Sequence, residues 1–266
     1  MNISIRDLHF AYAAGAEVLR GISLEIGSGE SVAIIGQNGS GKTTLAKHLN
    51  GLVRPTNGDV VVGDWNTRQH TVAQMSRRVG FLFQNPDEQI FKNRVWDEIA
   101  FGPGHLGLTH GELSKRVDAA MERAYLVDFR DAHPYELLPS QRRWVALASV
   151  LAMETPILVL DEPTTGQDVR GLARLGALVE DLIRSGKTVI TIAHDIDWCA
   201  EYCSRVAVMK QGRVLMDDDV HRVFAHADLL AQTFVEPPQI TRLGIEFGLQ
   251  QVVTIDEFLT ALAQTR

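Results

Sequence analysis

The chain has 266 residues, of which 45% are hydrophobic and 22% are charged, enough for one large core or one core with a subdomain. Its 33 acidic and 26 basic residues give a net charge of −7, which argues against nucleic acid as the main ligand. No apolar run approaches the roughly 18 residues of a membrane span, and residues 1–6 do not resemble a signal peptide. We therefore expect an intracellular protein that reaches a membrane only through partners.

Two half-buried strands are predicted near the N-terminus. Residues 3–12 and 22–26 both alternate apolar and polar side chains, as antiparallel strands with one face in the core do. Tyr12 lies at the end of the first strand. Its ring could stack on a purine base or serve as an ordinary strand-end aromatic residue, and the strand pattern alone leaves both roles open.

Residues 36–43 read Gly-Gln-Asn-Gly-Ser-Gly-Lys-Thr and match the phosphate-binding loop pattern. An apolar stretch over 31–35 predicts a buried strand before the loop, and 44–50 has the pattern of a helix. The glycines let the backbone wrap a phosphate, and the helix N-terminus adds partial positive charge. We expect Lys42 to reach the β- and γ-phosphates and the Thr43 hydroxyl to ligate Mg²⁺. The predicted nucleotide-binding residues of this loop are Gly36, Gln37, Asn38, Gly39, Ser40, Gly41, Lys42, Thr43 and Thr44.

The middle of the chain changes from strand to helix signals. Strands are predicted over 58–63 and 79–83, and the second of them ends at Gln84. From residue 89 to residue 152 the apolar spacing is helical, and 112–124 is one clear amphipathic helix. This change predicts a helical subdomain inserted into the sheet domain.

A fully apolar run over 156–160 delivers two carboxylates, Asp161 and Glu162, at its carboxyl end. Ligand sites of open α/β sheets lie at that edge. Asp161 suits coordination of Mg²⁺, directly or through water, and Glu162 suits orienting or deprotonating an attacking water. The next predicted core strand, 188–193, ends at His194, which we therefore expect beside the same edge and close to a γ-phosphate.

The last part of the chain reads as an attachment to the nucleotide core. A late strand pair is predicted over 205–209 and 213–216. The tail opens with Pro237-Pro238 and ends in a short amphipathic helix over 255–263. We therefore expect a nucleotide-binding domain over residues 1–235 and a C-terminal helical extension over 236–266.

The ordered motifs resemble the ATP-binding cassette (ABC) ATPases over nearly the whole chain. The matching segments are Tyr12 (adenine-stacking aromatic), 36–43 (Walker A), Gln84 (Q-loop), 157–162 (Walker B with the catalytic Glu), 166–168 (D-loop) and His194 (switch His). The resemblance implies an α/β P-loop NTPase fold with an antiparallel β subdomain, an inserted helical subdomain over about 89–152 and a short C-terminal extension. It also implies that ATP and Mg²⁺ are the cofactors, with Thr43, Gln84 and Asp161 serving Mg²⁺. In the same resemblance Glu162 activates water and His194 steadies the γ-phosphate.

Three stretches are similar to the ATPases of energy-coupling factor (ECF) transporters, the vitamin and metal uptake group: 84–91, 98–108 and 237–241. In that family two ATPase subunits face each other and bind coupling helices of a transmembrane scaffold protein, and a separate membrane subunit captures the substrate. The resemblance implies a peripheral protein on the cytoplasmic face of the membrane that hydrolyses ATP to drive uptake of a small nutrient. Apolar side chains at Ile90 and Phe91 predict that the surface around 84–91 receives a scaffold helix.

The signature motif departs from the family pattern Leu-Ser-Gly-Gly-Gln. In the matching register, residues 137–141 read Leu-Leu-Pro-Ser-Gln, so Leu138 replaces the signature serine and both glycines are gone. Leu138 has no hydroxyl and Pro139 has no N–H to offer a γ-phosphate held by the opposite subunit. Ser140, with Gln141 beside it, could partly replace the lost donor as a helix N-cap serine would. This departure favours a heterodimer with a second cassette over a homodimer.

Two alternatives to a transport ATPase are weighed. A soluble ABC protein of translation or DNA repair carries two cassettes per chain or a long coiled-coil insertion, and this sequence shows neither. A regulatory cassette that hydrolyses little is favoured by Leu138-Pro139 and opposed by the intact Glu162 and His194. The transported substrate is not readable here, because specificity in that family lies in another subunit.

Overall fold

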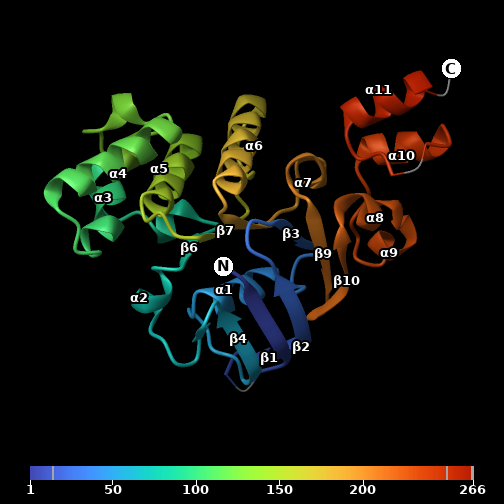
Figure 1. Cartoon of the computed structure of the whole chain (residues 1–266), viewed down its shortest axis with the longest axis horizontal. Coiled ribbons are helices and arrows are strands. Elements are labelled where there is room, and N and C mark those ends of the chain that lie inside the picture. The colour runs from blue at the N-terminus through green and yellow to red at the C-terminus, as the bar shows by residue number, and fades with distance from the viewer. Residues whose placement is uncertain (14, 250, 265–266) are drawn as a thin grey trace.

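The structure is a computed structural model that describes residues 1–13, 15–249 and 251–264. It contains a six-stranded sheet in the order β10-β9-β3-β8-β7-β6 and a four-stranded sheet in the order β2-β1-β4-β5 (Figure 1). The expected α/β fold with an antiparallel β subdomain and a helical subdomain is confirmed. The domain boundaries at 235 and 236 stay predictions.

The six-stranded sheet carries the phosphate-binding loop. Its strands are β3 (Ser31–Gly36), β6 (Val79–Leu82), β7 (Ile157–Asp161), β8 (Thr188–Ile192), β9 (Arg205–Lys210) and β10 (Arg213–Asp219). The first five of these are parallel to one another and β10 is antiparallel. Strands β3, β7 and β8 are buried along their whole length, because other elements cover both faces of the sheet. The parallel arrangement brings the carboxyl ends of these strands to one edge.

The four-stranded sheet is antiparallel. Its strands are β1 (Ile3–Ala11), β2 (Glu17–Ile26), β4 (Asn57–Val62) and β5 (Trp65–Asn66). Helix α1 (Lys42–Leu49), which follows the phosphate-binding loop, contacts both sheets. Its Leu45 and Leu49 are buried in one cluster with Ile34 of the large sheet and Val62 of the small one. The loop is therefore held between two sheets that share one core.

A group of helices lies between β6 and β7 in the chain. The elements of this segment and of the short region before β6 are α2 (Val72–Met75), η1 (Pro86–Glu88), α3 (Val95–Gly104), α4 (His110–Arg123), η2 (Val127–Phe129), η3 (Pro134–Glu136) and α5 (Pro139–Leu151). Helices α3, α4 and α5 contact one another and form one end of the molecule (Figure 1). Helix α5 also contacts β6 and η1, so it joins this subdomain to the central sheet.

The remaining helices cover the central sheet and form the C-terminal extension. They are α6 (Val169–Arg184), α7 (Ile196–Tyr202), α8 (Val220–Ala225), α9 (Ala227–Ala231), α10 (Gln239–Glu246) and α11 (Ile255–Gln264). Helices α10 and α11 lie at the end of the long axis opposite to α3–α5 (Figure 1). His221 bridges Asp219 and Glu257 at 3.0 and 2.8 Å and so ties α11 to α8. Within the described ranges, none of the helices has the length and apolar character needed to cross a membrane.

Candidate nucleotide-binding site

A cavity of about 250 Å³ lies at the carboxyl edge of the central sheet. Strands β7 and β8 pair in parallel, with Asp161 opposite Ile192, so the segments that follow these strands meet at this edge. The cavity is lined by Val18, Asn38, Gly39, Gly41, Lys42, Thr43, Thr44, Gln84, Glu162 and His194. Residues predicted from four separate segments of the chain therefore come together, and Val18 joins them from β2.

The phosphate-binding loop depends on glycine at defined positions. Gly36, Gly39 and Gly41 have φ values of 142°, 77° and 103°, which side chains other than glycine rarely adopt. A Cβ atom on Gly36 would lie 2.1 Å from the carbonyl oxygen of Met209. Ser40 is fully buried, and its hydroxyl has no hydrogen-bond partner within the described residues. Gly41 caps α1, whose N-terminus thus faces the cavity that this glycine lines.

Lys42 is the cation of the site. Its Nζ donates to the carbonyl oxygens of Gly36 at 2.7 Å and Gln37 at 3.2 Å, so the side chain folds back over the loop. Lys42 is buried, and this burial lowers its pKa, whereas the carboxylates of Glu162 and Asp161 raise it. The Lys42 ammonium group, which lines the cavity, therefore lies near the carboxyl groups of Glu162 and Asp161.

Thr43 and Asp161 form the candidate Mg²⁺ site. The Thr43 hydroxyl donates to Oδ1 of Asp161 at 3.2 Å, and Asp161 is 1% exposed. Burial raises the pKa of Asp161, and the hydrogen bond from Thr43 lowers it. Among the described residues there is no group of three or more His, Cys, Asp or Glu side chains that could hold a metal ion. A hydroxyl and a carboxylate are nevertheless the hard oxygen donors that Mg²⁺ uses when substrate phosphates complete its coordination, so the residues present fit the ion.

Glu162 and His194 both line the cavity and are in contact with each other. Oε1 of Glu162 lies 3.1 Å from Nε2 of His194, and the Glu162 side chain is 6% exposed against 49% for the histidine. Burial raises the pKa of Glu162 to about 7, although the nearby Lys42 opposes this shift. Burial and then Lys42 lower the pKa of His194. The pair therefore combines a carboxyl group that exchanges a proton near neutral pH with an imidazole that stays neutral there.

Two further predicted residues lie at the margin of the cavity. The Tyr12 hydroxyl is 3.3 Å from Oγ1 of Thr44, and its ring packs edge-on against Phe10 at 4.7 Å. Tyr12 is half exposed, so one part of its ring faces solvent. Gln84 is exposed and lines the cavity, while its backbone oxygen accepts a hydrogen bond from Arg143. Arg143 was not among the predicted site residues.

The signature segment begins α5 in a way that differs from the prediction. Leu138 is the N-cap residue, Pro139 is the first helical residue and Ser140 is the second, so Ser140 does not hold the N-cap position. Its role as a donor to the nucleotide of a partner subunit stays a prediction. Proline is favoured at that first position because its missing N–H would have no partner in the helix. The Leu138 N–H instead donates to Oε1 of Gln141 at 3.0 Å. Ser140 and Gln141 do not line the 250 Å³ cavity, and Leu138 is 65% exposed.

The segment after Gln84 presents one of its two predicted apolar side chains. Phe91 is 57% exposed, but Ile90 is 3% exposed and belongs to the core, so the prediction of a surface role for Ile90 is wrong. The ring of Phe101, 42% exposed, takes its place and packs edge-on against Phe91 at 4.7 Å. The ammonium group of Lys92 lies 5.2 and 4.7 Å from these two ring centres. We call Phe91, Lys92 and Phe101 the aromatic patch.

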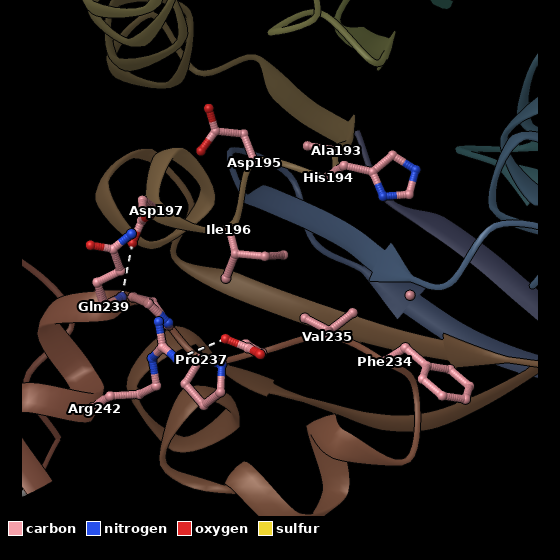
Figure 2. A pocket seen from close by; sticks show the side chains of 13 residues that line it. Ala193, His194, Asp195, Ile196, Asp197, Phe234, Val235, Pro237, Gln239 and Arg242 are labelled. Atoms are coloured by element: carbon pink, nitrogen blue, oxygen red, sulfur yellow. Dashed lines mark hydrogen bonds and ion pairs between the residues drawn. The ribbon is translucent and has the colours of Figure 1, made fainter.

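A second cavity, of about 350 Å³, also borders His194 (Figure 2). Segment 193–197 lines it together with residues 234–239 and Arg242. The Gln239 N–H donates to Oδ1 of Asp197 at 3.2 Å. The start of the C-terminal extension is thus hydrogen-bonded to the helix that follows the histidine, which the sequence pattern had not indicated.

Comparison with known proteins agrees with this geometry. Residues 19–165, more than half of the chain, match the family described as ABC transporter. The chain belongs to the ABC transporter ATP-binding proteins. This cassette is 40% identical over 260 residues to a protein of Pyrococcus furiosus assigned as an ABC transporter ATP-binding protein, covering 98% of this chain and 99% of that one. It is 36% identical over 243 residues to the energy-coupling factor transporter ATP-binding protein EcfA of Methanocaldococcus jannaschii, covering 91% of this chain and 87% of that one.

Other relatives are longer than this cassette. The chain spans about half the length of the first curated relatives it matches, 45% in proteins of Caldanaerobacter subterraneus and Methanosarcina mazei. Among solved structures, cbiO1 of Clostridium perfringens, part of the ABC transporter complex cbiONQ, is 32% identical with a TM-score of 0.78, covering 93% of this chain and 98% of that one. A dimeric ATP-binding cassette in a post-hydrolysis state with ADP and Pi is 26% identical with a TM-score of 0.76, covering 82% of this chain and 98% of that one.

Proposed function

We propose that this cassette binds and hydrolyses ATP to energise an ECF-type membrane importer of a small nutrient, a vitamin or a transition-metal ion. The observation that carries hydrolysis is the contact between Glu162 and His194 in the cavity that Lys42 also lines. Similarity to the archaeal EcfA protein and to cbiO1 supports the importer assignment. The cassette acts at the cytoplasmic face of the membrane through its partners.

The loop binds the phosphates and Tyr12 binds the base. Lys42 exchanges the two loop carbonyl oxygens that it now contacts for the β- and γ-phosphates. The N–H groups of the glycine-rich loop and the N-terminus of α1 add further positive potential to the same space. Tyr12, hydrogen-bonded to Thr44 next to the loop, stacks on the adenine through its exposed ring.

Thr43, Asp161 and the side chain of Gln84 would hold Mg²⁺ together with the phosphates. The ion supplies charge neutralisation for the phosphate oxygens when it is bound. The hydrogen bond between Thr43 and Asp161 supports this assignment, because it brings the hydroxyl and the carboxylate to one place.

Glu162 accepts a proton from the attacking water. A pKa of about 7 leaves a large share of this carboxyl group ionised near neutral pH, which is the condition for an efficient general base. His194, in contact with the carboxylate, orients the water and the γ-phosphate with its neutral ring. Catalysis of this kind depends on positioning and electrostatic stabilisation rather than on covalent chemistry.

Replacing Glu162 with Gln tests the assignment of the base. We expect the native membrane complex carrying Glu162→Gln to bind mant-ATP with unchanged affinity, while turnover at this site falls by about 10²- to 10⁴-fold. The glutamine keeps the shape of the side chain and removes its basicity. Unchanged turnover in the assembled complex would show that another group accepts the proton.

The aromatic patch receives a coupling helix of the transmembrane scaffold protein. Two exposed aromatic rings on a soluble subunit are a typical docking surface, and the patch follows directly on the loop of Gln84. We expect Phe91→Asp to release the cassette from its membrane complex and to leave binding of mant-ATP intact. Tyr125→Asp is the matched control, because Tyr125 is 54% exposed on the same subdomain and its ring packs against Trp144 and Arg174 instead of the patch. Survival of the complex with Phe91→Asp would remove the docking assignment.

The working unit pairs this cassette with a second one that has the consensus signature, and a separate membrane subunit captures the substrate. In a homodimer both nucleotides would face Leu138 and Pro139, which lack the usual donors. The missing signature donors also support the second candidate function, a regulatory cassette that hydrolyses little ATP. The two candidates differ in whether Glu162→Gln changes turnover of the complex.

A further inference from the structure

Helix α5 carries an arginine that bonds to two segments of the nucleotide site at once. Nη1 of Arg143 donates to the carbonyl oxygen of Gln84 at 3.1 Å and to that of Glu162 at 3.0 Å. A terminal guanidinium nitrogen carries two hydrogens, so both bonds can exist together. The residues that it joins follow two neighbouring strands, β6 and β7. Arg143 thus fixes the distance between the Q-loop residue and the proposed base.

The backbone of Glu162 needs such support. Its φ of 53° lies in the left-handed region, which residues other than glycine occupy only when their surroundings hold them there. The Glu162 N–H donates to the carbonyl oxygen of Ile192 at 2.8 Å, and its own carbonyl oxygen accepts from Arg143 and, at 3.3 Å, from the Thr165 N–H. Arg143 is the side chain among these partners, so it can be replaced without changing the backbone.

Arg143 also connects the site to the signature end of the same helix. Pro139, the first residue of α5, lies four residues before Arg143, which is about one helical turn. We propose that Arg143 is a positioning residue that holds Gln84 and Glu162 in register with α5, so that hydrolysis in this cassette depends on what the signature end of α5 contacts. This inference rests on the proposed roles of Gln84 and Glu162.

Other bonds keep the fold in place when the arginine is changed. Nε2 of Gln89 donates to the carbonyl oxygen of Ala146 at 2.7 Å and to Oγ of Ser149 at 2.9 Å, and its Oε1 accepts from the Phe83 N–H at 3.2 Å. The Q-loop segment therefore stays attached to α5 without Arg143. A variant at this position should fold and lose only the link to Gln84 and Glu162.

The experiment compares kcat and KM of Arg143→Met with those of wild type in the native membrane complex. We expect kcat to fall about 10- to 100-fold, because small displacements of catalytic groups have effects of this size. KM for Mg-ATP and the affinity for mant-ATP should stay within about twofold, since Arg143 does not line the nucleotide cavity. Arg116→Met is the matched control, because Arg116 pairs with Glu154 at 3.1 Å and does not line the cavity.

Arg143→Lys separates charge from bridging. Lysine keeps the positive charge but not the planar fork, so we expect a kcat between those of Arg143→Met and wild type. If Arg143→Met does not fold, a kcat of Arg143→Lys below wild type with unchanged KM still supports the proposal. Wild-type kcat in Arg143→Met, or in Arg143→Lys when the Met variant is unfolded, overturns it.

Measuring Glu162→Gln in the same assay distinguishes failure of the proposed base from failure of the positioning role of Arg143. If Glu162→Gln keeps wild-type turnover, the proposed base is wrong and the role of Arg143 falls with it. If Glu162→Gln is inactive while Arg143→Met matches Arg116→Met in kcat and KM, the positioning role alone is overturned.

Discussion

The two parts of this chain that serve ATP differ in how complete they are. The Walker side keeps a lysine, a hydroxyl and two carboxylates around one cavity, with a histidine in contact with the second carboxylate. The signature side, at the start of α5, presents an exposed leucine and a proline where the family has a serine and a glycine. In the proposed dimer each cassette combines its own Walker side with its partner's signature, so the contrast predicts that this chain is equipped for its own nucleotide and poorly equipped for its partner's.

Burial explains why the two sides can diverge. Lys42, Asp161 and Glu162 are at most 6% exposed and are bound to the loop and to the sheet edge, so their replacement would leave charged groups unpaired. Leu138 is 65% exposed and its side chain makes no hydrogen bond, so changing it hardly affects the fold of the monomer. The fold of the monomer therefore constrains the signature residue Leu138 less than it constrains the buried charged groups of the Walker side.

Restoring the consensus residues of the signature should change ATP turnover more than the other changes discussed below. We expect Leu138→Ser with Pro139→Gly to raise ATP turnover of the purified chain by up to about a hundredfold, because one donor to developing charge is worth on the order of 3 kcal/mol. The measurement is steady-state release of phosphate at a fixed, dimer-forming concentration. Leu138→Ala is the control, since it removes bulk and adds no donor. An equal gain in the control would indicate steric obstruction instead.

The pH profile should report on the Walker side alone. Glu162 has its pKa raised by burial to about 7, and a base must be unprotonated, so kcat/KM should fall below pH 7 by roughly tenfold per pH unit. Leu138→Ser with Pro139→Gly should raise kcat/KM at every pH, and the pH at which kcat/KM begins to fall should stay the same. A profile that stays flat down to about pH 5.5 would exclude Glu162 as the base.

Breaking the contact between His221 of α8 and Glu257 of the C-terminal extension should leave the Walker side and the signature side unchanged, and we expect the smallest effect from it. Burial opposes charging of His221, but its bonds to Glu257 and Asp219 outweigh this and raise its pKa. Burial would raise the pKa of Glu257, yet the bond from His221 and two backbone N–H groups lower it. The histidine contributes stability below its unfolded pKa and loses it as pH rises through the folded value, and the glutamate loses its contribution as pH falls through its own lowered pKa.

We therefore expect His221→Gln to lower Tm near pH 6, which lies between the pKa of Glu257 and the pKa of His221. Near pH 8.5 the same substitution should lower Tm less. Both side chains are about one third exposed, so solvent screening keeps the effect below about 1 kcal/mol, or about 2–4 °C for a chain of this size. Calorimetry at the two pH values, with Glu257→Gln as the partner variant, measures it. A change in ATP turnover that matched the change at Leu138 would show that the extension acts on hydrolysis.

Much of the fold and the site follows from local patterns. The apolar run before Asp161 had to be a buried strand, and the order of strand, glycine loop and helix fixed where Lys42 and Thr43 lie. The Glu162–His194 contact depends on the neighbouring positions of β7 and β8, which parallel sheets of this kind favour. The roles of these residues stay predictions that the variants test.

The missed features depend on packing that periodicity does not encode. Ile90 and Phe91 are adjacent and apolar, and only the position of α3 and α5 decides which of them is buried. Arg142 and Arg143 are adjacent and basic, yet the helix phase sends one to Asp87 and the other to Gln84 and Glu162.

Complementation between two variants of this chain tests the central claim most directly. One partner is wild type, with a complete Walker side and an incomplete signature, and the other carries Glu162→Gln with Leu138→Ser and Pro139→Gly. Only a mixed dimer joins an intact Walker side to a repaired signature. The account predicts that the mixture hydrolyses ATP at least about tenfold faster than either protein alone, within the effect of one or more recovered donors. A mixture no faster than the mean of its two components, with wild type alone as fast as the repaired chain, would contradict it.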